Sequence, residues 1–97
     1  MYSAIQAYNI AQEKQHHRYY QLYKRNARII MRHISKAVNR GETFYCFCGK
    51  KNTHMEMRVL KQLDEELTKI GYVCNVYYDV NEKTNKKVWK MSVKWRA

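Results

Sequence analysis

Residues 41–54 read GETFYCFCGKKNTH, and this stretch decides the fold because one helix ends in it and a second begins. Gly41 can adopt the left-handed conformation that ends a helix. The β-branched and aromatic run 43–48 is typical of a strand and is bounded by glycines on both sides. Thr53 and Glu56 then have the spacing of a capping box, which begins a helix. The stretch therefore predicts the order helix, strand, helix.

The region before Gly41 is predicted to be helical, because it contains neither proline nor another glycine. Its apolar residues recur at helical spacing, at Tyr19, Tyr23, Ala27, Ile30, Ile34 and Ala37. A second set of positions, roughly 150° around the same helix, is cationic and is called the basic stripe below. The basic stripe consists of Arg18, Arg25, Arg32, Lys36 and Arg40. The Gln/His-rich residues 12–17 leave open whether residues 1–41 form one helix or two.

The region after Thr53 is predicted to form a helix and two strands. Apolar residues keep the helical period from Val59 to Ile70, and Gly71 supplies the stop. Residues 72–80 and 87–95 alternate in polarity, as half-buried strands do, and the polar residues 81–86 form a hairpin loop between them. The fold class is therefore α+β, with a long N-terminal helix followed by β-α-β-β. We expect one domain over residues 1–97, with a core at 42–97 and a three-stranded, mainly antiparallel sheet of order 1-3-2 under the helices.

The net charge is +11, which makes an acidic partner the first hypothesis. Residues 1–41 carry a net charge of +7, residues 42–72 are neutral, and residues 73–97 carry +4. The sequence has no apolar run of membrane-spanning length and no signal-peptide pattern, and its three cysteines suit a reducing compartment. We therefore expect a cytoplasmic protein without a membrane partner.

The cysteines raise the question of a metal site. Cys46 and Cys48 lie two apart on the predicted strand, and together with Cys74 and His54 they suggest a Cys3His set. Known zinc knuckles use paired C-x2-C or C-x4-C turns rather than C-x-C on a strand. Because free cysteine is also among the most buried residue types, we predict that the thiols pack in the core and that no metal or cofactor is bound.

The sequence does not predict an enzyme. A phosphate loop would need a glycine where Phe44 stands, although Lys50 and Lys51 can still contact a phosphate backbone. No convergent set of acid, base and nucleophile can be named, so no catalytic residue is predicted.

Two classes of binding function are considered. The alternative to both is that the positive charge only provides solubility. In the first, an acidic protein docks on an Arg/Tyr-rich helix surface, because interface hot spots favour these residue types. That surface consists of Arg18, Tyr19, Tyr20, Tyr23, Arg25, Arg28, Arg32, Lys36 and Arg40.

In the second class of function, the basic stripe follows nucleic-acid phosphates while aromatic and basic residues provide a stacking surface. That second surface consists of Tyr45, Lys50, Lys51, Tyr77, Lys90 and Lys94. No helix-turn-helix, ribonucleoprotein or Gly-x-x-Gly motif predicts base-specific readout.

One resemblance bears on this choice. The succession Ile34, Ala37, Gly41, a short aromatic strand, Leu63, Leu67, Gly71-Tyr72-x-Cys74 and a last strand ending at Trp95 resembles the small early proteins of large tailed bacteriophages. The resemblance implies a non-enzymatic protein that binds a host machine, such as a protease, transcription or defence complex, and inhibits or redirects it. We therefore expect an acidic host protein as the partner, ahead of nucleic acid. The N-terminal helix of this chain is more basic than the helix of that group. Direct contact with nucleic acid therefore stays open as the alternative. Pairing of the long helix in a homodimer also stays open.

Overall fold

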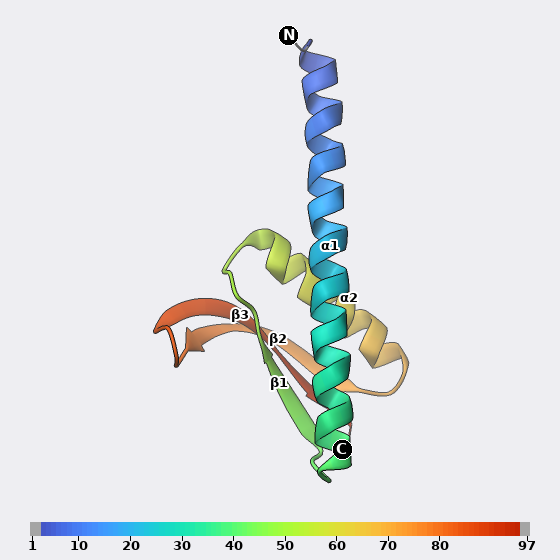
Figure 1. Cartoon of the computed structure of the whole chain (residues 1–97), viewed down its shortest axis with the longest axis vertical. Helices are drawn as coiled ribbons and strands as arrows, with labels where there is room; N and C mark the ends of the chain where they lie inside the picture. Colours follow the sequence, from blue (N-terminus) through green and yellow to red (C-terminus); the bar gives the residue numbers. More distant parts are fainter. Residues whose placement is uncertain (1–2, 96–97) are drawn as a thin grey trace.

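The computed structural model describes residues 3–95 and contains two helices and three strands in the predicted order. The first helix, α1 (Ala4–Asn39), runs without a break for 36 residues. The sequence left open a division near residues 12–17, and the structure shows one continuous helix there (Figure 1).

Both ends of α1 are capped by local hydrogen bonds. Ser3 and Gln6 form a capping box at the start, which sequence reading did not identify. At the other end Gly41 has a φ of 78°, and the Glu42 amide donates to the Ala37 carbonyl at 2.9 Å. This closing bond is the Schellman arrangement that glycine permits, so the predicted helix stop is confirmed.

The sheet has the predicted order, β1-β3-β2, and both pairings are antiparallel. Its strands are β1 (Phe44–Cys48), β2 (Val73–Asn81) and β3 (Lys86–Lys94). Met91, near the middle of the central strand, pairs with Phe47 on one side and Val76 on the other. Asn85 adopts a positive φ of 57° in the turn between β2 and β3.

Both helices lie on the same face of the sheet and form one core with it. The second helix, α2 (His54–Lys69), contributes Val59, Leu60, Leu63 and Leu67. These residues pack with Ile30 and Ile34 of α1 and with Phe47, Met91 and Val93 of the sheet. Within residues 3–95 no helix covers the opposite face, and Phe44 and Val73 are exposed there. The fold is therefore a two-layer α+β structure with one open sheet face.

The start of α2 differs from the predicted capping box in one half. The Thr53 hydroxyl accepts a hydrogen bond from the Glu56 amide at 3.2 Å, as predicted. The Glu56 carboxylate does not return to the Thr53 amide but turns into the protein, where the Asn26 amide group donates to it at 3.4 Å. Asn26 and Glu56 are the buried polar residues of the described chain. The buried contact of Glu56 with Asn26 of α1 therefore takes the place of the predicted contact with the Thr53 amide.

The N-terminal part of α1 extends beyond the rest of the molecule as an arm (Figure 1). We define the arm as residues 3–17. All of its residues are exposed except Ile10, which is half-buried. The core residues of α1 begin further along, at Asn26. The arm is thus a helical extension that contributes no buried residue to the core, although its base borders the start of α2.

Candidate anion-binding surface

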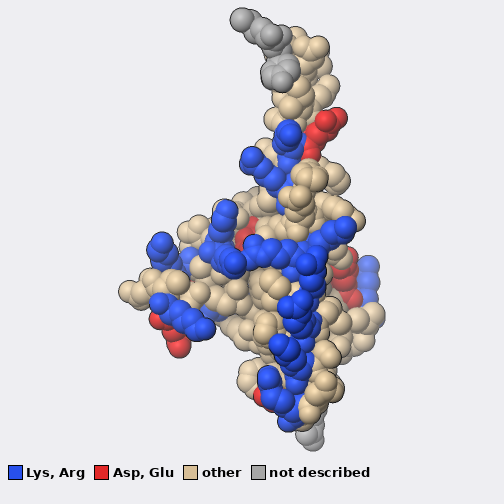
Figure 2. Space-filling model, viewed as in Figure 1, with Lys and Arg blue, Asp and Glu red and all other residues tan. Residues whose placement is uncertain are grey.

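The basic stripe forms a line of exposed cations along α1. Because the helix is continuous from Ala4 to Asn39, positions separated by seven or four residues stay on one side of it. All five stripe residues are exposed, and so is Arg28 beside them. At 1.5 Å per residue, the line from Arg18 to Arg40 is roughly 33 Å long. In Figure 2, Lys and Arg side chains form a nearly continuous basic band down the part of α1 that lies against the rest of the molecule.

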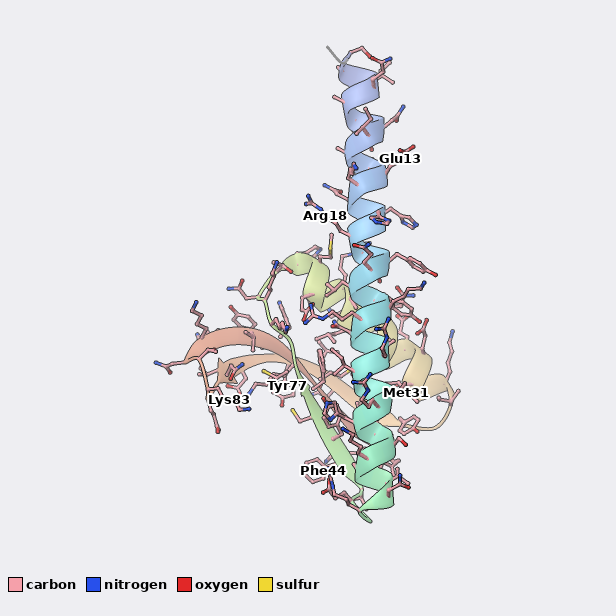
Figure 3. The ribbon with its side chains drawn as sticks, viewed as in Figure 1. Glu13, Arg18, Met31, Phe44, Tyr77 and Lys83 are labelled. Atoms are coloured by element: carbon pink, nitrogen blue, oxygen red, sulfur yellow. The ribbon has the colours of Figure 1, made fainter. Side chains whose placement is uncertain are left out.

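Most of these cations have no acidic neighbour. Among the described residues, Arg40 is the one stripe residue in an ion pair, with its Nε 2.9 Å from a Glu42 carboxylate oxygen. Glu13 projects to the other side of α1 from Arg18 (Figure 3). The charge of the stripe is therefore available to an external anion.

The structure brings the loop between β1 and α2 beside the stripe, a contact that the sequence did not predict. A pocket of ≈ 600 Å³ lies between them. Its lining comprises Arg18, Gln21, Leu22 and Arg25 of α1 and Lys50, Lys51, Thr53, Met55 and Glu56 of the loop and α2. Four cations therefore surround a pocket whose apolar lining is Leu22 and Met55. The sequence assigned Lys50 and Lys51 to one surface and the arginines to another, whereas the fold joins them.

Glu56 is the acid of this pocket, and its environment opposes ionisation. Burial raises the pKa of its carboxyl, while the hydrogen bond from Asn26 and the charge of Arg25 lower it. Glu56 is only 3% exposed, and its carboxylate accepts a hydrogen bond from the Asn26 side chain. Cations thus outnumber the acid at the pocket, and the cations are the exposed groups.

The tyrosines expected to anchor a protein partner divide between two sides of α1. The Tyr19 hydroxyl donates to Gln62 and the Tyr23 hydroxyl donates to Glu66, so both rings face α2. The bond to Glu66 is the main reason why the pKa of Tyr23 is raised to about 12. Tyr20 is exposed, and the Lys24 ammonium lies 4.8 Å from its ring centroid. None of the three tyrosines lies on the basic stripe.

The stacking surface expected on the open sheet face is smaller than predicted. Tyr77, Lys90 and Lys94 lie on that face, where Tyr77 pairs with Lys90 across the strands. The expectation that Tyr45 joins them is wrong, because Tyr45 pairs with Val93 on the helix side and stacks on His33 with ring centroids 5.2 Å apart. Lys90 is half-buried, and its ammonium is 3.9 Å from Asp79. The open face is therefore less basic than α1.

The cysteines occupy both faces of the sheet. Cys46 and Cys48 are exposed, so the prediction that they pack in the core is wrong, and Cys46 Sγ lies 3.1 Å from the Tyr77 hydroxyl. Cys74 is half-buried on the helix side, because it pairs with Val93 whereas Cys46 pairs with Ser92. Residues 3–95 contain no group of three or more His, Cys, Asp or Glu side chains that could hold a metal ion. The strand register separates the imagined Cys3His set.

No known protein family, curated protein or solved structure matches this chain. Neither helix among the described residues is long and apolar enough to cross a membrane.

Proposed function

We propose that the protein binds nucleic acid through the phosphate backbone, using the basic stripe together with Lys50 and Lys51. The observation that carries this proposal is the roughly 33 Å line of exposed cations, nearly free of acidic neighbours, that borders the pocket. Regularly spaced cations of this kind replace the counterions that condense on a phosphate chain. Binding without sequence preference is expected, because cations that contact phosphates do not distinguish bases.

The composition of the stripe favours a polyanion over an acidic protein. Protein interfaces gain most of their affinity from apolar or aromatic anchors that become fully desolvated at the centre. The stripe has no such anchor, because Tyr19 and Tyr23 are hydrogen-bonded to α2. Phosphate contacts require only exposed positive charge in a suitable line, which the stripe provides.

The test is fluorescence anisotropy with labelled duplex and single-stranded oligonucleotides at low salt. We expect the triple variant Arg25→Gln, Arg32→Gln and Lys36→Gln to bind at least about tenfold more weakly than the wild type. The matched control is Lys83→Gln, Lys86→Gln and Lys87→Gln, which removes the same charge from exposed positions in and beside the β2–β3 turn. The control should lose much less affinity. Equal losses in the two variants, or no binding by the wild type, would refute a specific role for the stripe.

A second candidate is docking on an acidic host protein, as the resemblance to phage early proteins implies. It is supported by a row of exposed apolar residues on α1, in which Tyr20, Met31 and Val38 are 50%, 46% and 50% exposed. At 100° per residue these residues lie on the side of α1 away from the stripe. One stoichiometric protein recovered from a nuclease-treated bacterial lysate, and lost both with Met31→Glu and with the stripe variant, would favour this function. Recovery of nucleic acid alone from an untreated lysate would favour the first.

A further inference from the structure

The arm is the part of α1 that differs most from the rest of the chain in charge. Its only formally charged residues are Glu13 and Lys14, so it is neutral in a chain of net charge +11. It also exposes large apolar side chains, because Ile5 is 75% and Tyr8 is 64% exposed. A helix of about 15 residues is marginal in water when it has no tertiary contacts. Binding of a partner to the arm would therefore bury these apolar side chains and stabilise the helix.

The apolar residues of the arm lie on the face that packs on α2 further along the helix. At 100° per residue, Ile5 and Tyr8 share a face with Gln12, Gln15 and Tyr19. Where this face meets α2, it borders a second pocket of ≈ 340 Å³. That pocket is lined by Gln12, Gln15, His16 and Tyr19 of α1 and by Met55, Arg58 and Gln62 of α2. One face of the arm thus carries apolar side chains at its tip and a pocket at its base.

A tip and a pocket on one helical face are self-complementary when two copies run antiparallel. If the arms cross near residue 10, Tyr8 of one copy lies opposite Gln12 of the other, and Ile5 lies opposite Gln15. Each tip then reaches the pocket at the base of the other arm. From this geometry we infer that the protein forms a homodimer in which the arms pair antiparallel and exchange Ile5 and Tyr8. Such a twofold contact uses the same patch on both copies, as symmetric dimers do.

The charge distribution identifies the occupant as a second copy. Two molecules of charge +11 repel each other, and this repulsion is weakest where the contact is made between segments without net charge, as the two arms are. An acidic partner would be attracted to the basic stripe rather than to the arm. Glu13 and Lys14 also give each arm one charge of each sign.

The antiparallel dimer places the two basic stripes on the same side. The stripe lies about 110° around α1 from the face that carries Ile5 and Tyr8. A twofold axis perpendicular to a pair of antiparallel helices keeps such flanking faces on one side. The dimer therefore presents two stripes to one surface, although dimer formation itself does not depend on what the stripes bind.

The oligomeric state of the full chain is measured by light scattering coupled to size exclusion, over a range of micromolar concentrations. We expect twice the mass of the chain for the wild type and a single-chain mass for Ile5→Glu and Tyr8→Glu. Ile70→Glu is the matched control, because Ile70 is 69% exposed at the end of α2 and should leave the dimer intact. Circular dichroism checks that the variants remain folded. A monomeric wild type, or a dimer that survives Tyr8→Glu, would overturn the inference.

The pairing direction is tested by disulfide cross-linking in a Cys46→Ser, Cys48→Ser background, which removes the exposed thiols. Mixing Ile5→Cys protein with Gln15→Cys protein should give a cross-linked pair on mild oxidation. Ile5→Cys alone should give little, because ten residues of helix separate the two equivalent positions by about 15 Å. Efficient cross-linking of Ile5→Cys to itself would indicate parallel arms and contradict the geometry.

Discussion

At the scale of single residues, the Asn26–Glu56 pair is the feature that most distinguishes this core. Asn26 is 1% and Glu56 is 3% exposed, and each is the other's buried side-chain partner. A buried polar group is tolerated only when it is hydrogen-bonded, so the pair fixes how the start of α2 sits against α1. The same contact holds Glu56 beside the basic pocket.

Removal of one member of the pair should be costly. Asn26→Ala leaves the buried Glu56 carboxyl without its side-chain donor, and we expect the free energy of unfolding to fall by about 1–3 kcal/mol. Urea denaturation followed by circular dichroism measures this change. Asn39→Ala is the control, because Asn39 is exposed in the last turn of α1. Equal stability of the two variants would show that the pair does not contribute.

The raised pKa of Glu56 predicts a pH dependence of stability. Its pKa in the folded protein is above the ordinary value of 4.5, so the folded state holds this proton more tightly than the unfolded chain. Its stabilising contribution is therefore complete below pH 4.5 and is lost as the pH rises through the raised pKa. The unfolding free energy of the wild type minus that of Glu56→Gln should decrease over this interval. A difference that is constant, or that increases with pH, would contradict the assignment.

The three thiols should differ in reactivity in the native protein. Cys46 and Cys48 are exposed and should react readily with Ellman's reagent. Cys74 should react slowly, because burial is the main cause that raises the pKa of its thiol to about 11 and keeps it protonated. Denaturation should release the third thiol. Rapid reaction of all three in the native protein would mean that α2 does not shield Cys74 on the helix side of the sheet.

At the scale of elements, the junction between β1 and α2 depends on a close approach at Gly49. Its amide donates to the Trp89 carbonyl at 2.8 Å, and a Cβ at this position would lie 2.8 Å from the same oxygen and would also meet the Glu56 carboxylate. A backbone atom cannot move away as a flexible side chain can. The loop that carries Lys50 and Lys51 is therefore held in place by this glycine.

Gly49→Ala should accordingly destabilise the fold by about 1–3 kcal/mol, as overpacking does. The midpoint of urea denaturation measures the loss. Lys50→Ala, at the adjacent exposed residue, should change stability by less than about 0.5 kcal/mol. If Gly49→Ala is as stable as Lys50→Ala, the loop is not fixed by this contact.

The elements themselves could be predicted from the sequence because their signals are local. Gly41 and Gly71 end both helices with positive φ, and alternation in β3 shows which residues face the core. The face of β1 could not be predicted, because the run FYCFC is apolar on both sides and only its register with β3 decides that Tyr45 faces the helices. Asn26 carried a weak signal, since it is a polar residue on the packing side of α1. The pocket between α1 and the β1–α2 loop could not be predicted, because it depends on how two helices cross.

At the scale of the whole molecule, the charge is separated along one long helix. The arm has no net charge and exposes Ile5 and Tyr8, and the part of α1 that packs on the body carries the basic stripe on its outer side (Figure 2). The projection of the arm from the body could not be predicted from the sequence, because the apolar residues of the arm have the same helical spacing as those of a packed helix. We therefore propose that one half of α1 mediates self-association and that the other half binds anions.

The most direct test of the anion-binding assignment is the salt dependence of affinity for a duplex oligonucleotide. With about five phosphate contacts from the basic stripe alone, the logarithm of the association constant should fall with the logarithm of salt concentration with a slope of roughly −4.5 or steeper. The triple variant Arg25→Gln, Arg32→Gln and Lys36→Gln should make the slope shallower by about 2.7, since each lost contact removes about 0.9. A wild-type slope near zero, or one that the triple variant leaves unchanged, would contradict nucleic-acid binding by the basic stripe.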